Sequence, residues 1–241
     1  MTTTQKRICM TGPASERAAK RWMEAALAAG WSPIHLPFVR IEAARIHAPA
    51  VTRAPAFVAI TSQNALPSLR RLWGERPDVR TAPHAAVGVA TARALRVLGV
   101  DPVFVSSEKD ANSTTLAAAL VDRTERGQRV LWPRGDRATD LKEMLQSAGR
   151  AVDAPVAYRS VDVEDTVVPR RLHAAFFASP SAVRVWIRTN ETPRVTPIAI
   201  GQTTQAELAP EYARFSRIEC LQAPTPKALR ETLAALGAPP G

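Results

Sequence analysis

Small polar residues follow several of the strands that the sequence predicts, and they recur at matching places in both halves of the chain. They are Thr61, Ser62, Gly88, Thr91, Ser179, Ser181, Gly201, Thr203 and Thr204. Each stands where a strand ends or the next helix begins, and the free N–H groups and positive dipole at such a point suit carboxylates or phosphates. Serine and threonine also occur there simply as helix caps, and glycine makes turns. The recurrence of these places as pairs favours a binding site for an anion.

Two further features offer side chains for chemistry. Residues 134–137 read Arg-Gly-Asp-Arg after a predicted strand, and they form either an anion site or a solvated turn. Tyr158 is one of only two tyrosines, and its phenol can donate a proton or a hydrogen bond to a departing hydroxyl group. From the bare sequence the simpler interpretation of Tyr158 is favoured, in which an amphipathic strand residue keeps its tip in water.

Other kinds of site have no matching pattern. The Gly-x-Ser-x-Gly elbow of hydrolases, the Gly-x-Gly-x-x-Gly fingerprint and the P-loop are all absent from the sequence. Cys9 and Cys220 lie in short apolar stretches, which predicts buried thiols, and the four histidines are scattered without zinc spacing. We therefore expect neither a metal ion nor a cofactor.

The elements that must position these residues also repeat. Ser62 and Ser179 are 117 residues apart, and Gly30 and Gly149, each of which ends a predicted helix, are 119 apart. Two copies of one strand–loop–helix design predict two similar lobes, each presenting small polar residues to a ligand.

Short apolar runs alternate with helical patterns along the whole chain. Strands are predicted at 7–10, 34–39, 57–60, 85–89, 103–105, 129–132, 154–161, 174–177, 197–200 and 218–221. Helices are predicted at 15–29, 64–73, 91–98, 114–120, 181–188, 203–208 and 226–236, and from a cap at Thr139 or Asp140 to Gly149. This alternation is typical of an α/β protein with parallel sheets and right-handed crossovers.

The charge of the chain limits its partners. The formal net charge is +10 over 241 residues, which permits a nucleic acid, an anionic membrane or a polyacidic small molecule. The arginines are spread out, without a basic block or interleaved aromatic residues, which argues against nucleic acid. No run approaches the ~18 apolar residues of a membrane span, and the N-terminus lacks an export signal, so we expect a cytoplasmic protein.

Taken together, the motifs resemble those of the uroporphyrinogen-III synthase family. They lie at residues 60–65, 87–92, 134–136, 156–159, 177–183, 200–204 and 224–226. They span nearly the whole chain in the family's order, and the ordered set is more specific than any single motif. The chain departs from the family at Gln202, where the family usually has proline, and around 211–215, where a frequent glycine is missing.

The resemblance implies two similar doubly wound parallel-sheet domains, joined by a two-stranded linker, with the substrate cleft between them. The first domain would contain residues 1–36 plus 162–241, and the second would contain residues 42–156. Residues 37–41 and 157–161 would be the connecting strands. The domain boundary would then be out of phase with the boundary of the repeat.

The resemblance also implies an activity. The family closes linear hydroxymethylbilane to uroporphyrinogen III, with loss of water and inversion of ring D, in the biosynthesis of heme, siroheme and cobalamin. Loss of the hydroxyl gives an azafulvene, whose attack on ring D forms a spiro intermediate that fragments and recloses with the ring reversed. Closure without enzyme gives the uninverted isomer, so the protein would act mainly by holding the substrate in a folded geometry.

By the family's pattern Tyr158 would assist departure of the hydroxyl, and Thr204 would contact the substrate as the second catalytic residue. The predicted substrate-binding residues are Thr61, Ser62, Asn64, Gly88, Thr91, Arg134, Gly135, Arg137, Ser179, Ser181, Ala182, Gly201 and Thr203. The role of the two arginines, binding acidic side arms, is our hypothesis and is not fixed by the motif. We expect a monomer that uses no metal or cofactor and binds this polycarboxylate, with neither a nucleic acid nor a membrane as partner.

Two other hypotheses remain open on the sequence. A non-catalytic two-lobed binding protein for an acidic small molecule fits the repeat equally well. The charge alone would fit a nucleic-acid-binding module, which predicts steeply salt-dependent binding.

Overall fold

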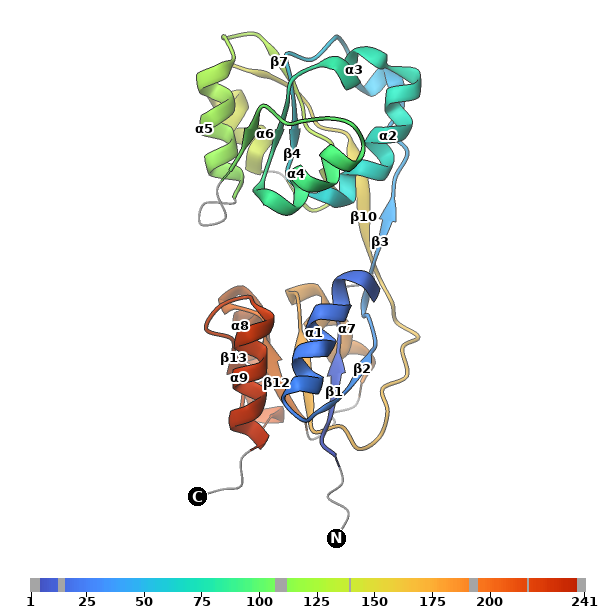
Figure 1. Cartoon of the computed structure of the whole chain (residues 1–241), viewed down its shortest axis with the longest axis vertical. Helices are drawn as coiled ribbons and strands as arrows, with labels where there is room; N and C mark the ends of the chain where they lie inside the picture. Colours follow the sequence, from blue (N-terminus) through green and yellow to red (C-terminus); the bar gives the residue numbers. More distant parts are fainter. Residues whose placement is uncertain are drawn as a thin grey trace. The chain divides into compact units, whose positions relative to one another are not determined.

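The structure is a computed structural model of the chain, and it divides into two compact units (Figure 1). Unit 1 comprises Met1–Arg40 and Val161–Gly241, and unit 2 comprises Ile41–Ser160. The structure describes residues 5–12, 16–106, 112–138, 140–190, 195–215 and 217–237. The predicted helix start at Ser15 and the predicted cap Thr139 lie outside the described residues.

Unit 1 is a parallel sheet with helices on both faces. Its strand order is β13-β12-β11-β1-β2, and every neighbouring pair is parallel. The strands are β1 (Arg7–Met10), β2 (Ser32–His35), β11 (Ala174–Phe177), β12 (Thr196–Ala199) and β13 (Glu219–Cys220). The helices are α1 (Glu16–Ala28), α7 (Pro180–Thr189), α8 (Gln202–Leu208) and α9 (Pro226–Gly237), with the short helix η3 (Ala209–Arg214) after α8.

The two faces of this sheet are buried by different helices because successive strand residues point to opposite sides. Ile8 and Met10 of β1 pack with Trp22 of α1 and Leu229 of α9. Cys9, between them, packs on the other face in the cluster that contains the buried residues of α7 and α8. Strands that are apolar at every position therefore suit a sheet covered on both sides.

Unit 2 repeats this architecture. Its strand order is β6-β5-β4-β7-β9, again with only parallel neighbours. The strands are β4 (Phe57–Ile60), β5 (His84–Ala86), β6 (Phe104–Val105), β7 (Arg129–Leu131) and β9 (Ala151–Asp153). One face is covered by α2 (Leu66–Glu75), α3 (Pro77–Thr81) and α4 (Gly88–Val97), and the other by α5 (Ser113–Arg123) and α6 (Asp140–Ser147). Two short helices, η1 (Ala48–Ala50) and η2 (Gln63–Ala65), precede α2.

Each unit is built from both halves of the sequence. Unit 1 takes two strands, β1 and β2, from the first half and three from the second; unit 2 takes three from the first half and two from the second. The strand orders correspond one to one, with β7 in the place of β1 and β4 in the place of β11.

A third sheet, with the order β3-β10-β8, contains β3 (Val39–Ala43), β8 (Arg134–Gly135) and β10 (Val156–Asp162). The predicted fold class, α/β with two parallel sheets, is confirmed.

Local boundaries differ from the sequence prediction at a few places. The strand expected at 85–89 ends at Ala86, because Gly88 takes a φ of 73° and turns the chain directly into α4. The extended segment expected at 34–39 is divided between β2 and β3, with Pro37, which has no N–H, in the gap. Strand β9 and helix α3 were not predicted, and the turn expected around 134–135 forms β8. Among the described residues no helix combines the length and the apolar character needed to cross a bilayer.

Candidate active site

The strand order of each unit reverses between two central strands, and in open α/β sheets ligands bind beyond the carboxyl ends of such strands. The reversal lies between β1 and β11 in unit 1 and between β7 and β4 in unit 2. Most of the predicted site residues follow β4, β5, β11 or β12. Each unit therefore has its own group of predicted site residues at the carboxyl ends of its strands.

In unit 2 the residue after β4 is fixed by the residue after β7. The indole Nε1–H of Trp132, a fully buried residue, donates to the hydroxyl oxygen of Thr61 at 3.1 Å. The neighbouring strand is held by the backbone N–H of Val87, which donates to the carbonyl of Ile60 at 2.9 Å. Thr61 is therefore held by interactions within unit 2 at the end of the central strands.

Ser62 and Ser179 act as helix caps, the simpler of the two roles that their positions allow. The hydroxyl oxygen of Ser62 accepts from the backbone N–H of Asn64, and that of Ser179 accepts from the backbone N–H of Ala182, both at 3.2 Å. Ser181 accepts from Nη2 of Arg184 at 3.3 Å. Asn64 and Ala182 are among the predicted substrate-binding residues, and a substrate that bound their N–H groups would have to share or replace these capping bonds.

The two glycines of the repeat differ in conformation. Gly88 has a positive φ, and its N–H donates to the hydroxyl of buried Ser106 at 3.0 Å. Gly201 is fully extended, with open space where a Cβ would lie, and its carbonyl accepts from the N–H groups of Thr204 and Gln205. Only Gly88 therefore needs the conformational freedom of glycine.

Thr91 and Thr204 are the repeated pair whose hydroxyls remain available. Thr91 is 6% exposed and Thr204 is 2% exposed, yet neither hydroxyl has a hydrogen-bond partner among the described residues. Neither oxygen is among the fully enclosed polar atoms, so each keeps a small contact with the outside. Burying an unpaired hydroxyl is unfavourable, and a ligand atom would remove that cost.

Tyr158 lies directly against Gly135, its partner in the β8–β10 pair. A Cβ on Gly135 would lie 2.8 Å from Cζ, 2.9 Å from Cε2 and 2.9 Å from the hydroxyl oxygen of Tyr158. The tyrosine ring is half-buried against the core of unit 2, and its hydroxyl has no partner among the described residues. The position of the phenol therefore depends on the absence of a side chain at residue 135.

The two arginines of the Arg-Gly-Asp-Arg segment bind backbone carbonyls. Nη1 of Arg134 donates to the carbonyls of Gly135, Asp136 and Ala138, each at 3.0 Å, and its Nε donates to Ala154 at 3.2 Å. Arg137 is exposed and donates to the carbonyl of Ser160 at 3.3 Å. Arg134 thus holds the loop beside Tyr158 in place, which leaves it less capacity for a substrate carboxylate than the sequence suggested.

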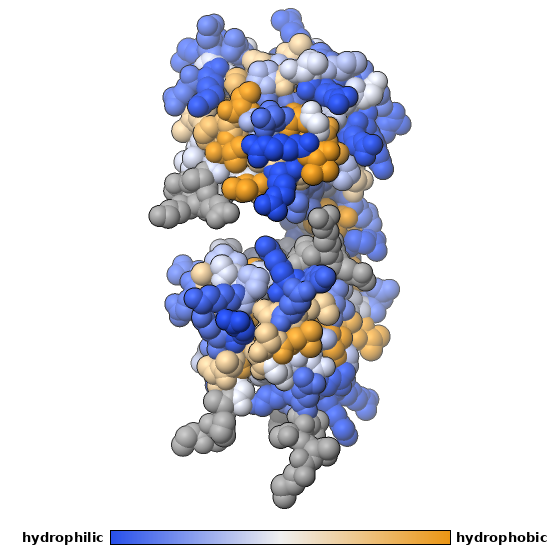
Figure 2. Space-filling view, in the orientation of Figure 1, coloured by the Kyte–Doolittle hydropathy of each residue, from blue (hydrophilic) through white to orange (hydrophobic). Residues whose placement is uncertain are grey.

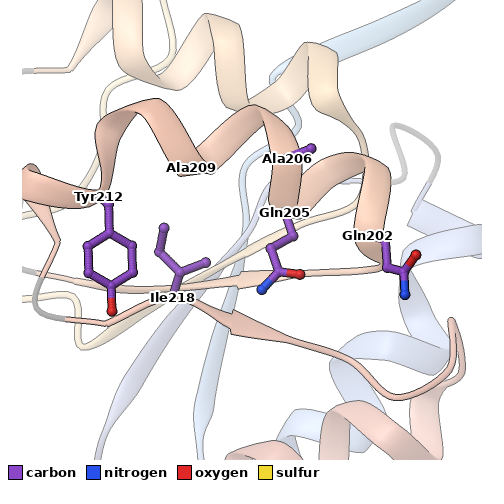
Figure 3. A pocket seen from close by; sticks show the side chains of 6 residues that line it. All are labelled: Gln202, Gln205, Ala206, Ala209, Tyr212 and Ile218. Atoms are coloured by element: carbon purple, nitrogen blue, oxygen red, sulfur yellow. The ribbon is translucent and has the colours of Figure 1, made fainter.

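Helix α8 carries Thr204 on its buried side and a cavity on its exposed side (Figure 3). The cavity has a volume of about 520 Å³ and is lined by Gln202, Gln205, Ala206, Ala209, Tyr212 and Ile218. Figure 3 shows the side chains of Gln205 and Tyr212 directed from the helical segment toward Ile218. Gln202, where the chain departs from the family pattern, lies at the end of this cavity next to Gly201.

Three supporting residues were missed by sequence reasoning: Thr11, Ser106 and Trp132. Thr11 follows β1, is 1% exposed, and donates from its hydroxyl to the carbonyl of Phe176 at 2.9 Å. The signal that would have found Thr11 and Trp132 is their place in the repeat, since each follows the first strand of its half. Ser106 has no such signal, because its role depends on the packing of β6 beside β5.

Both cysteines carry free thiols, with Cys9 buried and Cys220 half-buried. Burial raises the pKa of the Cys9 thiol to about 12, and burial also raises the pKa of Cys220. In the part of the chain that the structure describes, no three His, Cys, Asp or Glu side chains are placed to hold a metal ion. The chemistry available from the described site residues is therefore that of hydroxyl, phenol, guanidinium and backbone amide groups.

Comparison with known proteins assigns the family. The chain matches the family model described as Uroporphyrinogen-III synthase HemD over residues 20–229. Among solved structures, a mutant uroporphyrinogen III synthase from the extremely thermophilic bacterium Thermus thermophilus has a TM-score of 0.59 and 17% sequence identity, covering 96% of this chain and 99% of that chain.

The wild-type Thermus thermophilus enzyme in a second crystal form has a TM-score of 0.49 and 17% identity, covering 96% of this chain and 98% of that chain. No curated protein sequence matches the chain. At this identity the mutant structure, with its TM-score of 0.59, shows a shared fold, whereas the family model covers most of the chain. The chain therefore belongs to the uroporphyrinogen-III synthase family.

Proposed function

We propose that this enzyme binds hydroxymethylbilane at the carboxyl ends of the strands of both units and closes it with Tyr158 assisting departure of the hydroxyl. The reaction is that of the family, cyclisation to uroporphyrinogen III with inversion of ring D and loss of water, in tetrapyrrole biosynthesis. Which residues bind the substrate and which act on it is the proposal.

Recognition of the substrate would rest on its carboxylates. The formal net charge of +10 and the helix starts at the carboxyl edges of both sheets supply a favourable field for a polyanion. Thr91 and Thr204 would each donate from a hydroxyl that has no partner among the described residues of the protein. Hydrogen bonds to a charged acceptor are stronger than those between neutral groups, so these two hydroxyls would hold carboxylate arms firmly.

The chemical step would use the phenol of Tyr158. As the pyrrole nitrogen of the terminal ring pushes electrons toward the hydroxymethyl carbon, the carbon–oxygen bond breaks and the leaving hydroxyl takes up a proton to become water. The phenol would donate a hydrogen bond or that proton to the leaving oxygen, and the proton released from the pyrrole nitrogen as the azafulvene forms would restore the phenol. The remaining steps would need the substrate held folded, so that the azafulvene meets the substituted carbon of ring D.

The domain limits, the oligomeric state and the compartment of the protein are part of this proposal. The domains are residues 1–36 with 162–241 and residues 42–156, joined by 37–41 and 157–161. The protein acts as a monomer in the cytoplasm, without a nucleic acid, membrane, metal or cofactor. Ser62 and Ser179 support the site chiefly by capping the helix starts, and Thr61 and Ser181 lie beside them at the carboxyl ends of β4 and β11.

The observation that carries this proposal is the recurrence of one unpartnered, nearly buried threonine at the same place in each unit, together with the unpartnered phenol of Tyr158, all judged among the described residues. The decisive experiment is a conversion assay with freshly made hydroxymethylbilane and the purified protein. We expect mainly the type III isomer, whereas the buffer control gives the uninverted isomer. A product mixture equal to that of buffer would instead favour the non-catalytic binding protein.

A further inference from the structure

A second candidate site lies in unit 2, at the end of the strands opposite to the candidate active site. Two cavities of about 800 and 520 Å³ share Trp73 and Arg80 and form one surface, which we call the Trp73 groove. The groove reaches His84, the first residue of β5, and Val103, which directly precedes β6. It therefore lies at the amino ends of these strands, whereas Gly88 and Thr91 follow the carboxyl end of β5.

Positive charge in the groove comes from arginines that form no ion pair with the described residues. Arg70 and Arg80 line it, and neither has a carboxylate partner among the described residues. The acidic side chains in and beside the groove have arginine partners, and one of them, Asp101, lines the groove itself. They form the pairs Glu75 with Arg45 at 3.0 Å, Asp78 with Arg76 at 2.6 Å and Asp101 with Arg96 at 2.7 Å.

The groove also offers apolar surface for the body of a ligand. Val97 is 81% exposed and Val103 is 62% exposed, and both line the groove with Trp73. The guanidinium carbon of Arg80 lies 5.8 Å from the centroid of the Trp73 ring, so the cation and the indole form one contact surface. Figure 2 shows hydrophobic surface interrupted by hydrophilic side chains over the part of unit 2 that carries α4.

Two polar atoms in the residues of this groove have no partner. Nε1 of Trp73 and Nε2 of His84 are the buried side-chain nitrogens without a hydrogen bond in the part of the chain that the structure describes. Nδ1 of His84 lies 2.7 Å from the carbonyl of Ala82, so Nδ1 carries the proton of the neutral ring and Nε2 is an acceptor. Both nitrogens are enclosed, and the two rings pack edge to face with centroids 6.0 Å apart, so these rings form the back wall of the groove.

From these observations we propose that the Trp73 groove binds a small organic anion with a flat apolar body, its anionic group at Arg70 and Arg80 and its body against Trp73 and Val103. Ligand sites of this kind combine a mostly apolar lining with a few convergent polar groups. The site is separate from the candidate active site, so occupation of the groove and turnover can be measured independently.

The test is a fluorescence titration with anilinonaphthalenesulfonate, an aromatic anion, on the full-length protein. Arg80→Gln and Arg70→Gln remove one groove cation each. Arg71→Gln is the matched control, because Arg71 is exposed on the same helix as Arg70 and does not line either cavity. The neutral dye phenylnaphthylamine, which has the same apolar body without the sulfonate, tests the contribution of the anion.

We expect Arg80→Gln and Arg70→Gln to weaken binding of the anionic dye by about tenfold each, with Arg71→Gln close to the unmodified protein. The neutral dye should bind more weakly and respond little to either groove variant. All three variants should still convert hydroxymethylbilane normally. Equal affinity of the anionic dye for Arg80→Gln, Arg70→Gln and Arg71→Gln would overturn the proposal, whatever the outcome of the conversion assay.

Discussion

Tyr158 reaches its place only because its neighbour has no side chain. The ring of Tyr158 occupies the space in which a Cβ of Gly135 would lie, and Arg134 fixes the loop around it through four backbone carbonyls. At the scale of single residues, the candidate site therefore depends on Gly135 and Arg134, which position the phenol, as well as on Tyr158 itself.

The first prediction concerns the phenol itself. Tyr158→Phe keeps the ring and its packing but removes the hydroxyl, so we expect turnover to fall on the order of 100-fold with little loss of stability. The rate of type III isomer formation measures this effect. Unchanged turnover would remove the chemical role of Tyr158 and leave the family assignment intact.

Gly135→Ala should displace the same phenol without touching it chemically. A methyl group 2.8 Å from the ring must push the ring aside, so we expect reduced turnover and a loss of about 1–3 kcal/mol in unfolding free energy. Gly74→Ala is the control, because no atom beyond its chain neighbours and its own helix backbone lies within 4 Å of the added Cβ. Since Gly135 acts through the hydroxyl, Gly135→Ala should lower turnover no further in the Tyr158→Phe background; an additional large loss there would show an independent role.

Thr204 and Thr203 allow a comparison of adjacent hydroxyls. Thr204→Val removes a hydroxyl that has no partner among the described residues, so stability should be unchanged or slightly higher. If that hydroxyl binds a substrate carboxylate, the ratio kcat/KM should fall about tenfold. Thr203→Val, at an exposed position, should have a smaller effect, and the reverse order would assign the contact to Thr203.

At the scale of elements, the buried carboxylate of Asp153 links the segment that precedes β4 to β7 and β9, two neighbouring strands of the unit 2 sheet. Asp153, at the end of β9, accepts from Nη1 of Arg129 in β7 at 2.7 Å and from the backbone N–H of Thr52 at 2.9 Å. Its side chain is only 7% exposed, so these bonds have little competition from water.

Asp153→Asn should therefore lower the unfolding free energy by about 3 kcal/mol, because it leaves the Arg129 cation without its buried partner. Urea denaturation of the variant measures this loss. Asp101→Asn breaks an ion pair of the same length, 2.7 Å, that is exposed on both sides, and should cost at most about 1 kcal/mol. Equal losses in the two variants would show that burial does not strengthen the Asp153 contact.

At the scale of the whole molecule, the stability of unit 2 should depend on pH through His84. Burial lowers the pKa of this histidine below its ordinary value, so the folded protein keeps the ring neutral. As the pH falls below about 6.5, the ordinary pKa of histidine, His84 becomes protonated in the unfolded chain but stays neutral in the folded protein. The free energy of unfolding should therefore have its full value above about pH 6.5 and decrease below that pH.

His84→Gln removes this titration, so its unfolding free energy should fall less steeply between neutral pH and about pH 5 than that of the unmodified protein. The difference in slope is at most about 1.4 kcal/mol per pH unit for one proton. Urea denaturation across this range measures the slopes, with His47→Gln at an exposed position as the control. Parallel slopes for His84→Gln and the unmodified protein would contradict the prediction.

Local structure and family could be predicted from the sequence because both depend on short patterns. The strands at Phe57–Ile60 and Ala174–Phe177 are apolar at every position, and glycines mark where helices stop. The motif order predicted the family, which is confirmed. The limits of the two domains and the roles of the site residues stay predictions.

The sequence by itself determined the alternation of strands and helices, the repeat, and which residues follow each strand, since these are local properties of the chain. Only the tertiary structure decided that β1 pairs with β11 and β4 with β7, which places both halves of the sequence in each unit. It also separated residues that look alike in the sequence: Ser62 and Ser179 cap helices, Thr61 accepts from Trp132, and Thr91 and Thr204 keep their hydroxyls open among the described residues. The physical reason is that a hydrogen-bond partner is chosen by whichever group the fold brings within about 3 Å, and residues far apart in sequence supply that group.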